Sequence, residues 1–191
     1  MMRAAFLDRD GVINRRPPEG QYVTRWEELQ ILPGVPEAIA LLTQAGFCVL
    51  TVSNQRCVAK GLLTAAELES IHKRMCQDLA AQGAEITEVY YCPHELEPPC
   101  GCRKPAPGML LTAARAHQID LSASWMIGDS DIDVEAGRNA GCRTVRIVTG
   151  DEVPKEGADL LAPSLLEAVQ QMMELESLAT PRDRQARKLV R

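Results

Sequence analysis

The chain has 191 residues, which is enough for one well-packed domain of ordinary size. Hydrophobic residues make up 46% of it and charged residues 25%, and the formal net charge of −5 argues against a general nucleic-acid-binding protein. No run of about 18 apolar residues is present, and the charged N-terminus is unlike a signal peptide, so we expect a cytoplasmic protein without a membrane partner.

Five short apolar runs predict buried strands, and helical patterns lie between them. The predicted strands span 4–8, 47–54, 88–92, 125–129 and 144–148. The predicted helices span 36–46, the segment after a Thr64–Glu67 capping box, 107–118, and the segment from Ser164 to about Leu178. This alternation predicts an α/β fold with a Rossmann-like parallel sheet and helices on both of its faces.

The domain organisation follows from the same pattern. We expect one domain over residues 1–178 and a basic C-terminal tail over 179–191, which we interpret as a solvated terminus. No internal repeat and no second domain are indicated. Ligands of such sheets bind at the carboxyl ends of the strands, where Asp8, Ser53 and Asp129 are expected to meet.

The segment DRDGVIN begins with two carboxylates, Asp8 and Asp10, at the end of the first predicted strand. Residues two apart on an extended backbone project to one side, and Gly11 allows a sharp turn. Such a pair suits divalent-metal binding or a nucleophile beside an acid–base group. A calcium-binding loop is disfavoured, because its pattern needs another oxygen ligand before the Gly. A polar turn in which the two acids occur by chance remains as the alternative.

Two later segments supply further polar groups. Ser53 in SNQ can donate to a phosphate oxygen, although a turn or helix-cap role explains it equally well. Asp129 in GDSDID directly follows a strand and is the better metal ligand, whereas Asp131 and Asp133 are also explained by an acidic helix N-terminus. Lys104 can neutralise charge on a phosphate.

Three cysteines and one histidine crowd into residues 92–102. The spacing C-x-H-x5-C-x-C predicts a structural zinc site that is filled entirely by protein ligands: Cys92, His94, Cys100 and Cys102. Loosely buried thiols are the alternative, and a zinc module for nucleic acid is disfavoured by the tight spacing and the acidic chain. A zinc-stapled loop would orient the following cations, Arg103 and Lys104. The four remaining cysteines are given no role.

Four motifs in this order, DRDG (8–11), SNQ (53–55), RKP (103–105) and GDSDID (128–133), resemble those of the haloacid dehalogenase (HAD) superfamily of phosphatases. The cysteine-rich loop with CRKP resembles the histidinol-phosphatase-like branch, and within it the heptose bisphosphate phosphatases. The resemblance covers roughly residues 3–175. It implies a HAD-like fold without a large cap domain.

The resemblance also implies residue roles. Asp8 would be the nucleophile that forms an aspartyl-phosphate, and Asp10 the acid and base. Ser53 and Lys104 would stabilise the transferred phosphoryl group. Mg²⁺ would be held by Asp8, the backbone carbonyl of Asp10, and Asp129.

Substrate contacts are implied for two groups of residues. The first is the loop EGQYV, with Glu19, Gly20, Gln21 and Tyr22; the second comprises Asn54, Gln55, Arg56 and Arg103. The chain departs from the commoner family pattern near this pocket, with Ser53 in place of Thr, Arg56–Cys57 in place of Ser-Gly, and Ser130 in place of Lys. Further cations that could meet a second phosphate are Arg15, Arg16 and Arg25.

The expected activity is therefore Mg²⁺-dependent removal of the 7-phosphate from a heptose 1,7-bisphosphate, by a monomer acting on a phosphorylated sugar. Histidinol phosphate is the alternative substrate, although its cationic amine suits a pocket with several arginines less well. A non-catalytic zinc-stapled binding domain is the alternative from another class.

Overall fold

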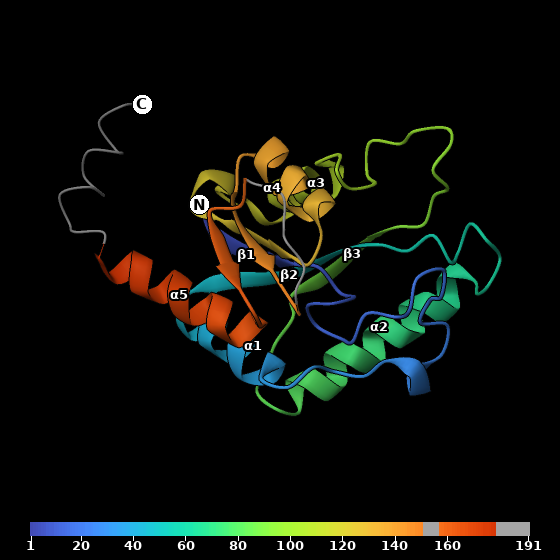
Figure 1. Ribbon diagram of the computed structural model, residues 1–191, viewed down its shortest axis with the longest axis horizontal. Helices are drawn as coiled ribbons and strands as arrows, with labels where there is room; N and C mark the ends of the chain where they lie inside the picture. Colours follow the sequence, from blue (N-terminus) through green and yellow to red (C-terminus); the bar gives the residue numbers. More distant parts are fainter. Residues whose placement is uncertain (151–156, 179–191) are drawn as a thin grey trace.

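The computed structural model describes residues 1–150 and 157–178. Within them, six parallel strands form one sheet in the order β3-β2-β1-β4-β5-β6 (Figure 1). The strands are β1 Arg3–Leu7, β2 Phe47–Asn54, β3 Glu88–Cys92, β4 Trp125–Gly128, β5 Arg143–Ile147 and β6 Leu160–Ala162. In register, Leu7 of β1 lies opposite Thr51 of β2 and Ile127 of β4, so these three strands end close together.

Five α-helices of the described residues cover the two faces of the sheet (Figure 1). They are α1 Val35–Gln44, α2 Ala65–Ala80, α3 Gly108–His117, α4 Asp131–Ala140 and α5 Leu165–Leu178, with 3-10 turns η1 at Trp26–Glu28 and η2 at Leu121–Ala123. Helices α1, α2 and α5 pack on one face, and α3 and α4 pack on the other. The fold is therefore the predicted Rossmann-like parallel sheet with helices on both faces.

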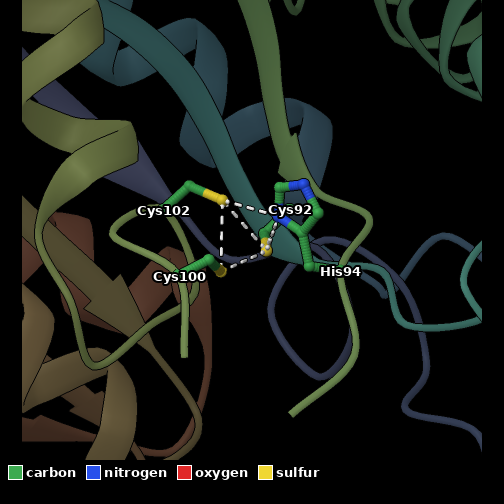
Figure 2. A group of neighbouring side chains, drawn as sticks. All are labelled: Cys92, His94, Cys100 and Cys102. Atoms are coloured by element: carbon green, nitrogen blue, oxygen red, sulfur yellow. Dashed lines mark hydrogen bonds between the residues drawn. The ribbon is translucent and has the colours of Figure 1, made fainter. Parts of the chain in front are cut away.

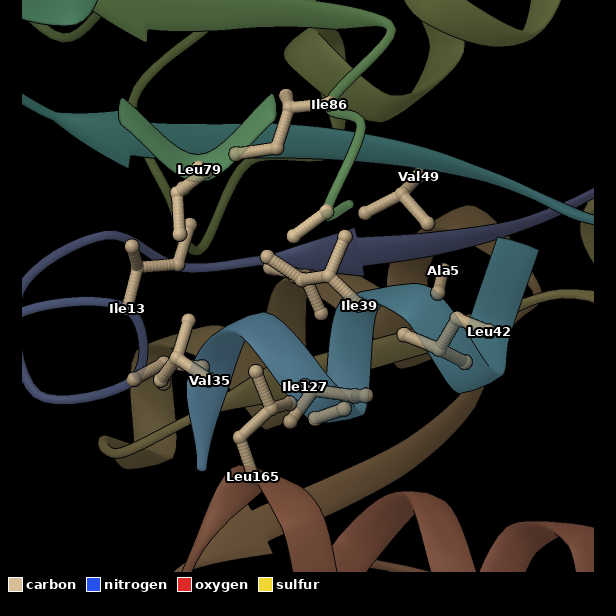
Figure 3. Close-up of a cluster of buried hydrophobic side chains, with 14 of the residues drawn as sticks. Ala5, Ile13, Val35, Ile39, Leu42, Val49, Leu79, Ile86, Ile127 and Leu165 are labelled. Carbon is tan, nitrogen blue, oxygen red and sulfur yellow. The ribbon is translucent and has the colours of Figure 1, made fainter. Parts of the chain in front are cut away.

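Alternation along the strands explains why both faces are apolar. In β1, Ala5 and Leu7 belong to the cluster under α1, α2 and α5, whereas Ala4 and Phe6 belong to the cluster under α3 and α4. All four side chains are fully buried. Figure 3 shows how Ile39 of α1 lies among the sheet residues of the first cluster. A strand buried on both faces reads as a continuous apolar run, which made β1 easy to predict.

The predicted strands and helices are confirmed, with shifts of bounds at their ends. Both sides of the Thr64–Glu67 capping box are present: Glu67 N donates to Thr64 Oγ1 over 3.2 Å, and Thr64 N donates to Glu67 Oε2 over 2.7 Å. Strand β6 and helix α4 were not predicted as elements. The predicted tail, 179–191, lies outside the described residues.

The connections that could carry a cap are short. In the described part of the chain, η1 and α1 lie between β1 and β2, and α2 lies between β2 and β3. The expectation of no large cap domain is thus confirmed. No helix of the described ranges is both long and apolar enough to cross a membrane.

Candidate active site and metal centres

The carboxyl ends of β1, β2 and β4 bring the predicted polar residues together. Asp8 directly follows β1 and its N–H donates to Ile127 O of β4 over 2.9 Å, which continues the strand pairing up to the nucleophile candidate. Ser53 and Asn54 end β2, and Asp129 follows β4. Carboxylate oxygens of Asp8, Asp129 and Asp133 lie within 4.8 Å of one another.

Lys104 is fixed at the centre of this edge. Its Nζ lies 2.8 Å from Asp8 Oδ1 and 2.6 Å from Asp133 Oδ1, and it donates to Val52 O over 2.8 Å. The lysine is 3% exposed. Burial alone would lower the pKa of Lys104, but the carboxylates of Asp133 and Asp8 outweigh it and raise that pKa. The residue is therefore a permanent cation against the Asp8 carboxylate.

Asn54 holds the backbone of that lysine from the end of β2. Its Nδ2 donates to Lys104 O over 3.1 Å, and its Oδ1 accepts from Lys104 N over 3.0 Å. This paired hydrogen bond connects strand β2 to the loop that follows the cysteine-rich segment. Asn54 therefore positions the backbone of Lys104 and leaves the ammonium group of the lysine free to bind other groups.

The carboxylates at this edge fit a divalent cation. Asp129 Oδ1 is buried and has no hydrogen-bond partner within the described ranges. Burial and the neighbouring Asp8 raise the pKa of Asp129 to about 7, and burial raises the pKa of Asp8 to about 6, with Lys104 opposing and Asp133 adding. A bound divalent ion would relieve this clustering of acidic groups.

Asp10 has its own set of hydrogen-bond donors, which the other carboxylates do not share. It accepts hydrogen bonds from Asn14 Nδ2 over 2.9 Å, from Gln55 Nε2 over 3.0 Å, and from the Arg9 guanidinium. Burial alone would raise the pKa of Asp10, but Arg9, Asn14 and Gln55 together lower it. The second carboxylate of the DRDG motif therefore has an environment different from that of Asp8.

A pocket of about 470 Å³ opens over the strand ends. Its lining includes Asp8, Asp10, Ser53, Asn54 and Lys104, together with the predicted substrate loop Glu19, Gly20, Gln21 and Tyr22 and with Arg16. Its volume lies within the range of small-molecule sites.

Three other predicted substrate contacts lie outside that lining. Gln55 is buried and donates to Asp10 and, over 2.8 Å, to Ser53 Oγ. Arg56 pairs with Glu95 over 2.5 Å, and Arg103 Nη1 donates to His94 O over 3.4 Å. Their contact with substrate stays a prediction.

The predicted zinc ligands converge where β3 ends and in the loop that follows it, as Figure 2 shows. Cys92 Sγ lies 3.6 Å from Cys100 Sγ and 3.2 Å from Cys102 Sγ, and His94 Nδ1 lies 3.2 Å from Cys102 Sγ. Ligands about 2.3 Å from a tetrahedral centre lie roughly 3.8 Å apart. The four side chains thus fit a closed site for one metal ion, and their sulfurs are too far apart for a disulfide.

The chain is similar in sequence to a family model and to curated proteins. The HAD-hydrolase-like family model matches residues 101–168. The D-glycero-beta-D-manno-heptose-1,7-bisphosphate 7-phosphatase of Pseudomonas aeruginosa is 41% identical over 161 residues, covering 84% of this chain and 89% of the relative. That of Pseudomonas putida is 42% identical over 149 residues, covering 78% and 84%.

The chain belongs to the D-glycero-D-manno-heptose-1,7-bisphosphate 7-phosphatase family.

A solved structure agrees with this family. The D,D-heptose 1,7-bisphosphate phosphatase of B. bronchiseptica, complexed with magnesium and phosphate, superimposes with a TM-score of 0.82 at 35% identity, covering 91% of this chain and 99% of that one. A HAD-like phosphatase from Mesorhizobium loti superimposes with a TM-score of 0.76 at 29% identity, covering 89% of this chain and 87% of that one. The predicted HAD-like fold and heptose bisphosphatase resemblance are confirmed.

Sequence reasoning missed part of this family member's site. Asp133, weighed only as an acidic residue of a helix N-terminus, is fully buried and binds Lys104, and its Oδ2 also accepts from Ser130 N over 3.0 Å. The i, i+3 spacing of Ser130 and Asp133 is a capping-box signal that was available. Arg9 was not singled out either, although its side chain is fully buried beside Asp10.

Proposed function

We propose that this chain removes the 7-phosphate from D-glycero-D-manno-heptose 1,7-bisphosphate in a Mg²⁺-dependent reaction, through a phosphorylated Asp8. The names of its relatives support the substrate, and the B. bronchiseptica complex supports magnesium and phosphate as ligands of such a site. The observation that carries the proposal is the placement of Lys104 Nζ, 2.8 Å from Asp8 Oδ1, at the base of a pocket.

Asp8 is the nucleophile in this proposal. A carboxylate oxygen of Asp8 attacks the phosphorus atom, and the bond between phosphorus and the C7 oxygen breaks. Lys104 and the Ser53 hydroxyl donate to the phosphoryl oxygens, where negative charge must be neutralised. Lys104 meets this need without moving, because Asp133 and Val52 O already hold its ammonium group.

Asp8, Asp129 and the backbone carbonyl of Asp10 would hold Mg²⁺. When bound, the ion neutralises phosphate charge and orients the phosphoryl group for in-line attack. Asp133 offers a further carboxylate at this edge but is already bound by Lys104 and Ser130. We therefore assign Asp133 to lysine positioning.

Asp10 supplies and removes the protons. In the first step its carboxylic acid gives a proton to the leaving C7 alkoxide. In the second step its carboxylate takes a proton from the water that attacks phosphorus, which releases inorganic phosphate and regenerates Asp8. Arg9, Asn14 and Gln55 lower the pKa of Asp10, and the negative charge of an arriving phosphate opposes them by favouring the protonated form.

The substrate loop and Arg16 would recognise the rest of the sugar bisphosphate. Arg16 lines the pocket, is 55% exposed at its side chain, and lies 3.3 Å from Asp129 Oδ2. Among the arginines considered for the second phosphate, Arg16 is therefore the best placed. Arg25 is bound to Glu28 over 2.9 Å at the surface.

Zinc in the cluster Cys92, His94, Cys100 and Cys102 would act structurally. All four ligand positions are filled by protein side chains, which leaves none for water. The cluster precedes Arg103 and Lys104 directly, so a bound zinc ion would restrict the loop that carries the catalytic lysine.

Phosphate release from heptose 1,7-bisphosphate and from histidinol phosphate tests this function. We expect kcat/KM to be higher for the heptose bisphosphate, to require Mg²⁺, and to fall by more than about a thousandfold in Asp8→Asn. Equal or higher kcat/KM for histidinol phosphate would contradict the substrate. Phosphate release that survives Asp8→Asn would contradict the nucleophile, and no release from either ester by the wild type would favour a binding domain.

A further inference from the structure

Behind the catalytic edge lies a buried polar group that the reaction described above does not use. Arg9 stands between Asp8 and Asp10 in the chain, and its side chain extends to His72 of helix α2. Arg9 is fully buried and His72 of α2 is 4% exposed. Burial of a guanidinium far from solvent is costly unless its N–H groups are bound.

The guanidinium of Arg9 joins Asp10 to His72. Its Nη2 donates to Asp10 Oδ2 over 2.8 Å and to Oδ1 over 3.0 Å, and Nε donates to Oδ1 over 3.2 Å. On its other side, Nη1 lies 3.1 Å from His72 Nε2. Arg9 therefore has one partner at the active site and one in the helix layer.

In the contact between Arg9 and His72, the donor and the acceptor follow from the chemistry of the two groups. A guanidinium has donors and no acceptor, so His72 Nε2 must accept and its proton must lie on Nδ1. Burial and the positive charge of Arg9 lower the pKa of His72 to about 3, which keeps the imidazole neutral. The ring is also placed by an edge contact with Tyr91 of β3, whose ring centroid lies 5.6 Å away. His72 is therefore a fixed, neutral acceptor.

We propose that His72 is a positioning residue for the acid–base chemistry of Asp10, acting through Arg9. The imidazole holds Nη1 and so orients the opposite edge of the guanidinium, against which both Asp10 oxygens rest. Because Asn14 and Gln55 also bind Asp10, the carboxylate is oriented from several sides. The inference rests on the proposed role of Asp10 and deepens it.

The test compares two substrates whose leaving groups differ in basicity. Protonation by Asp10 matters most when the leaving group is a basic alkoxide, and little when it is p-nitrophenolate. The ratio kcat/KM includes only steps up to the phosphorylation of Asp8, so the later role of Asp10 as a base does not enter. Loss of folded protein lowers kcat/KM on both substrates by the same factor.

We expect His72→Leu to lower kcat/KM on heptose 1,7-bisphosphate about tenfold to a hundredfold, at the low end of general-acid effects, and to lower it much less on p-nitrophenyl phosphate. His72→Gln retains an amide oxygen that can accept from Arg9 and should recover most of the lost rate. Arg9→Lys, whose single ammonium cannot span both partners, should show the selective loss again and serves if His72→Leu does not fold.

Equal losses on the two substrates, or no rescue by His72→Gln, would overturn the inference. Asp10→Asn serves as the reference. If Asp10→Asn itself shows no preference between the two leaving groups, the proposed role of Asp10 fails instead. If wild type releases no phosphate from heptose bisphosphate, the proposed substrate fails.

Discussion

Gly11 brings the backbone of the DRDG turn against Asp129, the candidate metal ligand. Its φ of +94° lies in the left-handed region, and an added Cβ would stand 1.7 Å from Asp129 Oδ2. No shift of a flexible tip relieves this contact, because Asp129 Cγ would also lie 2.4 Å away. Only glycine therefore lets the DRDG turn pass so close to the candidate metal ligand.

Gly11→Ala should weaken Mg²⁺ binding by at least about tenfold, because the methyl group displaces Asp129. Gly61→Ala is the matched control, since Gly61 has φ +67° and nothing within 4 Å of an added Cβ. Both variants should lose about 1–2 kcal/mol of folding free energy from the left-handed backbone. Thermal unfolding and Mg²⁺ titration of each variant measure the two effects. Equal Mg²⁺ affinities in the two variants would contradict the assignment of Asp129.

At this scale the sequence predicted residues whose spacing is itself informative. Asp8 and Asp129 each follow a predicted strand, and Lys104 follows the cysteine-rich motif. All three lie close together at the carboxyl ends of the strands, as predicted. Arg9 and His72 carried no such signal. A charged residue inside DRDG is exposed by default, and its burial depends on α2 packing over it, which only the tertiary structure shows.

Among the elements, the cysteine-rich loop is the one that we expect to depend most on the proposed zinc ion. Its residues from 93 to 107 form neither helix nor strand, and it leads from β3 to Lys104. Its far end is tied to neighbouring elements by Asn54 at the end of β2, by the hydrogen bond from Asn139 Nδ2 to Pro105 O, and by the ammonium group of Lys104, which binds Val52 O, Asp8 and Asp133. Loss of zinc should therefore loosen Lys104.

We expect Cys100→Ser to lose bound zinc and to lower kcat/KM at saturating Mg²⁺ by about tenfold or more, while Mg²⁺ affinity changes less. Cys48→Ser is the control, because Cys48 lies on β2 outside the cluster. Zinc content by metal analysis and steady-state kinetics provide the two readouts. Unchanged kcat/KM in zinc-free Cys100→Ser would contradict a positioning role for the loop.

The two elements that sequence reasoning missed have physical reasons. Strand β6 spans only Leu160–Ala162 and, within the described residues, pairs with β5 alone, so its apolar pattern is too short to predict a strand. Helix α4 has an acidic first turn and few apolar residues, and its buried side includes Asp133, Ala136 and Gly137. Its core side therefore lacks the stripe of large apolar residues that indicates a helix such as α2.

For the whole molecule, strand order decides which residues share the site. Strand β1 lies between β2 and β4, so Asp8 is flanked by Ser53 on one side and Asp129 on the other. The loop after β3 then needs to cross only the end of β2 to bring Lys104 to Asp8. Alternation of strands and helices predicted a parallel sheet, but the neighbours of β1 followed only from the motifs and their resemblance.

The central claim is that Asp8 accepts the phosphoryl group. Asp10→Asn provides the means to trap it: with p-nitrophenyl phosphate the first step needs little acid, whereas hydrolysis of phosphorylated Asp8 lacks its base. We therefore predict that acid quenching of Asp10→Asn during turnover of labelled p-nitrophenyl phosphate recovers label on the peptide that contains Asp8, and that Asp8→Ala/Asp10→Asn recovers none. Label on another residue, or the same label without Asp8, would contradict the account.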